Sequence, residues 1–266
     1  MKVGKLKIES WVRLSVIVAT WLASTTALPG EPQRRRAPVH GFTVVQSFPH
    51  DPAAFTQGLV YADGEFFEST GLHGESSVRR VDVATGRVLQ HRAVEARYFA
   101  EGLALVGDAL IQLTWQQNTG LVYDRATFAL RQTFSYATEG WGLAYDPKGG
   151  LVLSDGSDRL SFLDPQTYGV IRTVRIADAG RPVTQLNELE WIEGEVWANV
   201  WGTDRIARIS PLTGVVSSWV DLTSLWPRER RTPAADVLNG IAYDPAAKRI
   251  FVTGKKWPLV YEIEVR

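Results

Sequence analysis

From residue 41 onward the chain alternates short apolar runs with polar turns, and this alternation predicts β-strands throughout. The stretch FTQGLVYADGEFFESTG, residues 55–71, is one such unit: an apolar run, a turn at Asp63-Gly64 and a second apolar run, which together indicate a β-hairpin. After the N-terminal leader no segment keeps an apolar 3.6-residue period, although DLTSLWPRER, residues 221–230, has room for one helical turn. We therefore expect an all-β domain.

The hairpin of residues 55–71 recurs four times along the chain. The further copies span residues 98–115, 139–156, 185–201 and 237–255. Each begins with a polar or aromatic pivot, followed by a small or acidic residue and then Leu or Ile. The pivots are Gln57, Glu101, Trp141, Asn187 and Asn239, spaced 44, 40, 46 and 52 residues apart. A period in the forties with several short strands per repeat is typical of propeller blades.

The fifth unit ends at PLVYEIEVR without a fourth strand, whereas the N-terminal stretch GFTVVQSF, residues 41–48, belongs to no unit. Pairing this stretch onto the last blade as its outermost strand would close the ring and remove exposed edges. We therefore predict a five-bladed β-propeller over residues 41–266. Two unrelated β-sandwiches would explain neither the repeated pivot nor the missing strand.

The N-terminus has the pattern of a targeting segment. Four basic residues precede the apolar stretch LSVIVATWLA, which is short for a membrane span, and STTALPG then offers small residues for cleavage near Ala27. We expect a signal peptide over residues 1–27, a polar linker over 28–40 and export to the periplasm or the exterior. An uncleaved membrane anchor remains the alternative.

Composition narrows the classes of function. The 266-residue chain has a formal net charge of zero, which gives no support for nucleic acid or an anionic membrane as a partner. It has no Cys, and its four His are scattered, so we expect neither a catalytic thiol nor a metal site nor a cofactor. We expect a monomer.

In a propeller the start of each inner strand and the end of the next strand meet at one mouth of the central channel, and unusual residues occur at both places. The strand starts offer Phe55, Gln57, Phe99, Glu101, Trp141, Asn187 and Asn239, and the strand ends offer Glu68, Trp115, Asp155, Trp201 and Lys255. Asn239 and Asp155 equally suit turn geometry, and Glu68 fits either a structural or a functional role. A second set of equivalent positions holds Ser69, Thr114, Ser154, Asn199 and Thr253. We interpret these residues as structural and expect their side chains to form hydrogen bonds between blades.

Two features of this mouth point to chemistry. Trp115, Trp141 and Trp201 at equivalent positions suggest an aromatic pocket. Glu101 lies between Phe99 and Leu103 with no basic residue nearby in sequence, so desolvation should raise its pKa and suit it to proton transfer.

The chain resembles the glutaminyl-peptide cyclotransferases of the plant and bacterial type from about residue 42 to its end. The motifs FTQGL, ESTGLHGESSVRRVD, FAEGL, GWGL, LNELE, DVLNGIAYD and VTGKKWP carry the resemblance, in that order. It implies a five-bladed propeller that converts the N-terminal glutamine of peptides or proteins to pyroglutamate, releases ammonia and needs no metal. It also implies site residues at the matching positions: Phe55, Gln57, Phe99, Glu101, Trp115, Trp141, Asn187, Trp201 and Lys255.

This chemistry suits the residues on independent grounds. An aromatic pocket would fold the flexible glutamine side chain for intramolecular attack, and one carboxyl of raised pKa, Glu101, would transfer the protons. Gln57, Asn187 or Lys255 would stabilise negative charge on the amide oxygen. We expect Phe55, Phe99, Glu68 and the three Trp residues to bind substrate. Two alternatives stay open: a non-catalytic propeller that binds a peptide terminus or a sugar, and a glycosidase or lyase that uses Glu68 and Glu101 as its carboxylate pair.

Overall fold

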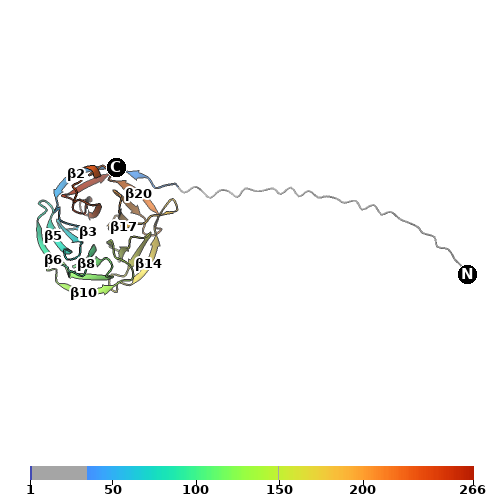
Figure 1. The fold of residues 1–266 in the computed structure, drawn as a ribbon, viewed down its shortest axis with the longest axis horizontal. Helices are drawn as coiled ribbons and strands as arrows, with labels where there is room; N and C mark the ends of the chain where they lie inside the picture. Colours follow the sequence, from blue (N-terminus) through green and yellow to red (C-terminus); the bar gives the residue numbers. More distant parts are fainter. Residues whose placement is uncertain (2–34, 149) are drawn as a thin grey trace. The chain divides into compact units, whose positions relative to one another are not determined.

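The computed structural model describes Met1, residues 35–148 and residues 150–266, and the predicted signal peptide and most of the predicted linker lie outside these residues. From residue 35 onward the chain forms a ring of five sheets, antiparallel apart from one short parallel pair in the fourth (Figure 1). This arrangement confirms the predicted five-bladed β-propeller. In each blade the first strand lies nearest the centre of the ring and later strands lie further out.

The blades follow one another along the chain. Blade 1 contains β3 (Thr56–Ala62), β4 (Glu65–Thr70), β5 (Ser77–Asp82) and β6 (Val88–Ala93). Blade 2 contains β7 (Ala100–Val106), β8 (Ala109–Thr114), β9 (Thr119–Asp124) and β10 (Leu130–Ser135). Blade 3 contains β11 (Leu143–Asp146), β12 (Gly150–Ser154), β13 (Arg159–Leu163) and β14 (Val170–Arg175).

The last two blades include strands from the N-terminal part of the chain. Blade 4 contains β17 (Leu186–Ile192), β18 (Glu195–Val200), β19 (Arg205–Ile209) and β20 (Val216–Asp221), with β1 (Val39–His40) parallel to β20. Blade 5 contains β21 (Leu238–Asp244), β22 (Arg249–Gly254), β23 (Leu259–Val265) and, outermost, β2 (Phe42–Pro49). Strand pairing thus begins at residue 39, two residues before the predicted start of the propeller. A small ladder, β15 (Ala177–Asp178) with β16 (Arg181–Pro182), lies between blades 3 and 4 in sequence.

The N-terminal strand is the fourth strand of the fifth blade. β2 pairs antiparallel with β23 from Phe42 opposite Val265 to Pro49 opposite Leu259, with an irregularity between Val44 and Gln46. The two ends of the folded chain therefore share one sheet, which gives the last blade a strand on its outer side.

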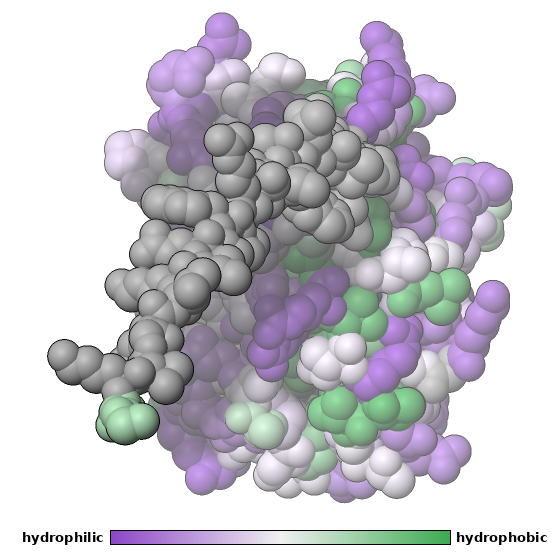
Figure 2. All heavy atoms as spheres, turned by 90° about the vertical axis from the view of Figure 1, so that its right-hand side faces the viewer, coloured by the Kyte–Doolittle hydropathy of each residue, from purple (hydrophilic) through white to green (hydrophobic). Residues whose placement is uncertain are grey.

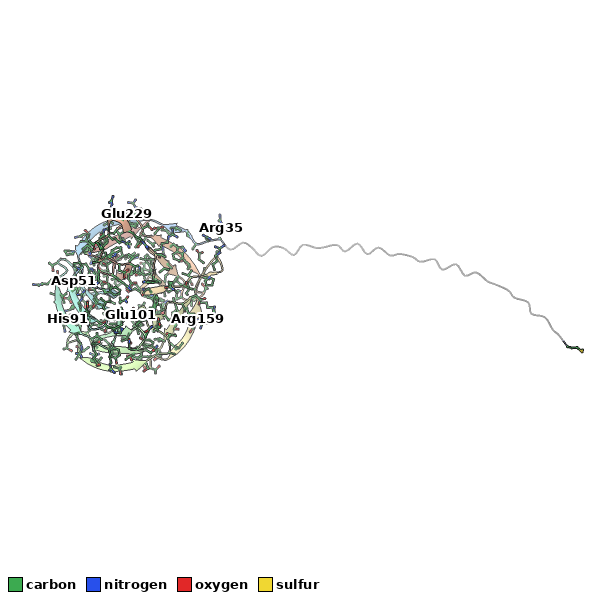
Figure 3. All side chains as sticks on the ribbon, in the orientation of Figure 1. Arg35, Asp51, His91, Glu101, Arg159 and Glu229 are labelled. Atoms are coloured by element: carbon green, nitrogen blue, oxygen red, sulfur yellow. The ribbon has the colours of Figure 1, made fainter. Side chains whose placement is uncertain are left out.

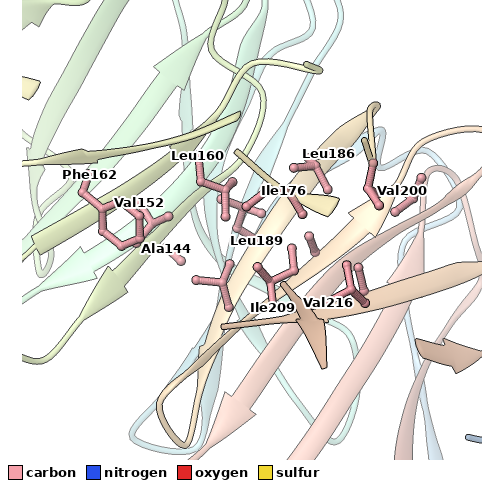
Figure 4. Close-up of a cluster of buried hydrophobic side chains, with 14 residues drawn as sticks. Ala144, Val152, Leu160, Phe162, Ile176, Leu186, Leu189, Val200, Ile209 and Val216 are labelled. Carbon is pink, nitrogen blue, oxygen red and sulfur yellow. The ribbon is translucent and has the colours of Figure 1, made fainter. Parts of the chain in front are cut away.

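The alternating strands give the blades apolar faces, which pack against one another to form the core. One cluster joins blades 3 and 4, with side chains from both sheets interleaved between them (Figure 4). Its members include Ala144, Val152, Leu160, Phe162, Leu186, Leu189, Ile209 and Val216. Similar clusters join the other neighbouring blades, so the ring is held by apolar contacts around its whole circumference.

Near the ring axis, glycine follows the pivot in four of the five copies because neighbouring inner strands touch there. A Cβ on Gly102 would lie 2.5 Å from the backbone nitrogen of Leu143 in the next blade. In the fourth copy the residue is Glu188, whose buried carboxylate accepts hydrogen bonds from the backbone N–H groups of Leu59 (3.3 Å) and Ile241 (2.9 Å). Glu188 thus links blade 4 to blades 1 and 5.

Within the described residues the helical content is a single 3-10 turn, η1 (Arg228–Arg230), inside the stretch where one turn was predicted. The part of the chain that the structure describes contains no helix that is long and apolar enough to cross a membrane. On the side of the ring shown in Figure 2, hydrophilic and hydrophobic residues are mixed over the surface.

Candidate functional site

Glu101 is the second residue of the inner strand β7 and lies toward the centre of the ring (Figure 3). Its side chain is buried, with 6% of its surface exposed. The Oε1 atom accepts a hydrogen bond of 2.9 Å from Nε2 of Gln57, the pivot of blade 1. The Gln57 oxygen in turn accepts one of 3.2 Å from Nδ2 of Asn239, the pivot of blade 5. Three pivots that are distant in sequence therefore form one chain of hydrogen bonds.

Burial raises the pKa of the Glu101 carboxyl well above its usual range, as the sequence suggested. The charge of Lys255 opposes this shift, and the charge of Glu139 adds to it. Lys255 is itself buried, and this burial lowers the pKa of its ammonium even though Glu101 and Asp236 act in the opposite direction. The Lys255 Nζ lies 4.7 Å from the ring centroid of Phe55, so the ammonium is held against an aromatic face.

Aromatic rings from all blades but the fifth lie in two groups at the mouth where the inner strands start. Phe55 and Phe99 meet edge to face at 6.1 Å between centroids, and Phe99 meets Trp115 in the same way at 5.8 Å. Trp141 and Trp201 form the second group, at 6.3 Å. Trp201 leaves 48% of its surface exposed, whereas Trp115 and Trp141 are half-buried.

Glu139 joins the two aromatic groups, and the sequence analysis did not select it. Its Oε2 accepts hydrogen bonds from the indole N–H groups of both Trp115 (2.7 Å) and Trp141 (3.0 Å), and its Oε1 accepts one from Gln116 (3.1 Å). Glu139 stands two residues before its pivot, as Phe55 and Phe99 do. Comparing that repeat position across all five copies would have found it.

The strand register shows which strand ends are equivalent. The residue that follows the paired end of the second strand is Gly71 in blade 1, Trp115 in blade 2, Trp201 in blade 4 and Lys255 in blade 5. In each case its backbone N–H donates to the carbonyl two residues before the pivot: Phe55, Phe99, Gln185 and Val237 respectively. The register of blade 3 places Gly156 at the corresponding position.

The two glycines at these positions make room for aromatic rings. A Cβ on Gly71 would collide with the ring of Phe99. Gly156 has φ of +77°, which favours glycine, and a Cβ there would lie 2.7 Å from the ring of Trp141. Phe99 and Trp141 can therefore lie against the backbone of a neighbouring strand.

This register corrects the predicted placement of Glu68 and Asp155, which are not equivalent to Trp115. Glu68 pairs with Leu59 in the position that Gln112 holds opposite Leu103, three residues before the strand-end position. Asp155 instead accepts hydrogen bonds from Ser157, the turn role that was its alternative. The turn of blade 3 is one residue longer than those of blades 1, 2 and 4, which displaced Asp155 in the repeat alignment. The turns of blades 1 and 2 have equal length, so the same spacing from the pivot already gives Gly71 rather than Glu68 as the equivalent of Trp115.

Glu68 belongs to a buried ionic cluster at the ring closure. With 1% of its surface exposed, it accepts hydrogen bonds from Thr56 (2.7 Å) and His50 (2.9 Å) on Oε1 and from Arg79 (2.5 Å) on Oε2. Both oxygens are therefore already bound inside the protein. We assign Glu68 to the structure of the ring, and the predicted substrate contact and carboxylate pair with Glu101 gain no support from these contacts.

Asn187 is buried at the start of β17. Its Oδ1 atom is buried and has no hydrogen-bond partner among the described residues. Its backbone carbonyl accepts a hydrogen bond of 2.7 Å from Ser154 in blade 3. Ser69 and Asn199 of the predicted structural ring also bond to a neighbouring blade, whereas Thr114 and Thr253 bond within their own.

A separate cavity of about 400 Å³ opens at the other ends of the inner strands, lined by Tyr61, Tyr145, Glu190, Trp191 and Tyr243 among others. Glu101 and the aromatic groups described above lie at the opposite mouth, where the inner strands start and the second strands end, and do not line this cavity. Across residues 35–148 and 150–266 no group of three or more His, Asp or Glu side chains is placed to hold a metal ion. The polar and aromatic groups that gather at the mouth where the inner strands start are a carboxyl, an ammonium, amides and indoles.

Comparison with known proteins was made on sequence and on structure. The family model described as glutamine cyclotransferase matches residues 16–265. A glutaminyl-peptide cyclotransferase of Arabidopsis thaliana is 47% identical over 232 residues, which are 86% of this chain and 72% of that protein. The crystal structure of Myxococcus xanthus glutaminyl cyclase superposes with a TM-score of 0.79 at 36% identity, covering 86% of this chain and 98% of that one.

Proposed function

The chain belongs to the glutamine cyclotransferase family, and we propose that it closes the N-terminal glutamine of peptides or proteins to pyroglutamate. The observation that carries this proposal is the buried Glu101, whose carboxyl has a raised pKa and interacts with Glu139, the carboxylate that binds the indoles of Trp115 and Trp141. Such a group can give and take a proton near neutral pH, which an ordinary exposed carboxyl does poorly.

The reaction needs one bond made, one bond broken and one proton moved. The α-amine nitrogen of the substrate bonds to its own side-chain carbonyl carbon, and the bond from that carbon to the amide nitrogen breaks. The amine loses one proton and the departing NH₂ gains one, so ammonia leaves. Glu101 carries out both transfers, because a protonated carboxyl donates to the leaving group from one oxygen and accepts from the amine on the other.

The surrounding residues support this step. The aromatic groups bind the glutamine side chain and hold it folded, which supplies the near-attack geometry on which intramolecular ring closure depends. Negative charge develops on the amide oxygen during attack, and the ammonium of Lys255, whose charge acts on Glu101, stabilises it. Gln57 keeps Glu101 in place through its 2.9 Å hydrogen bond.

Purified protein and a dipeptide that begins with glutamine provide the test. We expect ammonia and the pyroglutamyl product in equal amounts, and we expect turnover to continue in EDTA or phenanthroline. A protein that binds the peptide but releases no ammonia is the non-catalytic binding module that the sequence left open. Loss of turnover with a chelator, restored by zinc, would contradict the metal-independent chemistry.

We also propose that the protein is exported and acts as a monomer. The basic and apolar pattern of residues 1–27 supports export. The blades bury their apolar faces against one another around the ring, which supports a protein that needs no partner to cover them. N-terminal sequencing of the mature protein should find cleavage near residue 27, and light scattering should give the mass of one chain. A cell-associated protein with an intact N-terminus would contradict the export.

A further inference from the structure

Glu139 makes contacts that the proton transfer at Glu101 does not require. One oxygen of its carboxylate accepts two indole N–H groups, at 2.7 Å from Trp115 and 3.0 Å from Trp141. These two indoles come from different blades: Trp115 follows β8 of blade 2, and Trp141 precedes β11 of blade 3. A third hydrogen bond, from Gln116, fixes the other oxygen.

We propose that Glu139 is a positioning residue of the active site, which holds the indoles of Trp115 and Trp141 at the mutual orientation that the glutamine side chain requires. This inference rests on the proposed function. An indole has one polar atom, and a charge-assisted hydrogen bond to it sets the rotation of the whole ring. Because one oxygen serves both indoles, neither ring can turn without breaking a bond to the shared acceptor.

The charge of Glu139 has a second consequence for Glu101. Burial alone would raise the pKa of Glu139, but its hydrogen bonds to Trp141, Trp115 and Gln116 hold that pKa below the usual range, so it stays ionised. The titratable groups that interact with Glu101 are Lys255, Glu139 and Tyr136. Lys255 favours the ionised form of Glu101 and Glu139 favours the protonated form. Removing the charge of Glu139 therefore lowers the pKa of Glu101.

Two substitutions separate these effects. Glu139→Gln keeps an oxygen that can accept the indole N–H groups but removes the charge. Glu139→Ala removes both. Asp178→Asn is the matched control, because Asp178 also accepts an indole N–H, from Trp219 at 3.1 Å, but does so in blade 4 away from Glu101.

We expect Glu139→Ala to lower kcat/KM by about 10- to 100-fold, with a raised KM, since small displacements of positioning groups cost about this much. We expect Glu139→Gln to keep most of the affinity and to move the Glu101-dependent limb of the pH–rate profile to lower pH. Asp178→Asn should match the wild type in both measurements.

A double-mutant cycle with Trp115→Phe and Trp141→Phe shows whether Glu139 acts through the indoles. In the protein that carries Phe at positions 115 and 141, which lacks both indole N–H groups, Glu139→Ala should have little further effect on KM. Additive losses would overturn the positioning role, and so would a Glu139→Ala variant with wild-type kinetics. Binding of a peptide with N-terminal norleucine, followed by Trp fluorescence, gives a readout without turnover and should weaken in parallel. If the wild type releases no ammonia, the proposed function fails, whereas active wild type with unaffected Glu139 variants refutes this inference alone.

Discussion

The carboxyl of Glu101 accepts a 2.9 Å hydrogen bond from the side-chain amide of Gln57, and the two residues hold the same repeat position in neighbouring blades. Both are buried, so the carboxyl receives a protein donor in place of water. A carboxamide at position 101 would offer the same acceptor oxygen to Gln57. Replacing Glu101 by Gln should therefore disturb the fold much less than it disturbs proton transfer.

This relationship gives the sharpest prediction, for Glu101→Gln. The variant should fold with a melting temperature near that of the wild type and still bind a peptide with N-terminal glutamine. Its turnover should fall by at least about 100-fold, because the group can no longer donate and accept a proton. Ammonia release by the purified variant, measured beside a thermal melt, checks both parts.

Glu68→Gln is the control for that experiment. It removes a buried charge from contact with Arg79 and His50, so we expect a loss of stability of about 3 kcal/mol, typical of breaking a buried ion pair. The folded fraction should keep most of its specific activity. Near-normal turnover in Glu101→Gln together with an inactive Glu68→Gln would assign the proton transfer to the other carboxylate.

The fold and most of the site follow from the repeated pattern of the sequence. The pivots occur once per blade, and the ring brings each of them to the same mouth, so Gln57, Glu101 and Asn239 meet although up to 182 residues separate two of them. The repeat period predicts one pivot per blade, and the alternation of side chains along a strand predicts which of them face the same way. These two patterns are therefore enough to predict that the pivots meet.

Contacts between side chains of different blades could not be predicted in the same way. Glu139 acquires its partners only when Trp115, Gln116 and Trp141 converge on it. The placement of Asp155 failed for a related reason, since the turn of blade 3 is one residue longer than those of blades 1, 2 and 4 and changes which strand-end residue reaches the mouth. Turn lengths vary between copies without changing the strand pattern, so only the paired register resolves them.

The three tryptophans of the site should affect substrate binding more than stability. Trp115→Ala, Trp141→Ala and Trp201→Ala should each weaken binding and ring closure together, because each removes an aromatic surface beside the reacting group. Stability should fall by less than the ~3–5 kcal/mol typical of a fully buried aromatic residue, and least for Trp201, which is 48% exposed. Steady-state kinetics and denaturant unfolding of each variant test this.

Trp257→Phe is the comparison for these variants, since Trp257 is fully buried in the core of blade 5. It should lose stability and retain the specific activity of the folded fraction. If the three site variants behave in the same way, the aromatic groups are ordinary core and the substrate binds elsewhere.

His50 should make the stability of the protein depend on pH. Its Nε2 lies 2.9 Å from the Glu68 carboxylate and its Nδ1 lies 2.6 Å from the Trp257 carbonyl, so both nitrogens donate when the ring is protonated. Burial opposes the charge, but the charge and hydrogen bond of Glu68 prevail and raise the pKa of His50 above its ordinary 6.5. Burial likewise opposes the ionisation of Glu68, but Arg79 and His50 prevail and lower its pKa.

The two shifts set the pH window of greatest stability. The His50 contribution is complete below about pH 6.5 and is lost as the pH rises through its raised folded pKa, whereas the Glu68 contribution is complete above about pH 4.5 and is lost at lower pH. We expect the cluster to stabilise most between these values. Urea unfolding across pH should show an alkaline decline that His50→Gln flattens, and an unaltered profile in that variant would show that another group titrates.

The last prediction concerns the closure of the ring by β2. This strand pairs with β23 along its whole length, and it leads directly to His50, whose backbone N–H donates to the Pro258 carbonyl at 2.8 Å. A mature protein that starts at residue 49 would lose these strand pairs and expose the edge of β23, which invites pairing with other chains. We expect a sharp drop in melting temperature and a tendency to aggregate. A second protein that starts at residue 41 keeps β2 and loses β1 together with the hydrogen bonds of residues 37–40, including those to Asp178 and Arg266, so its melting temperature should fall much less. Equal melting temperatures for the two truncations would show that the ring does not depend on β2 for its stability.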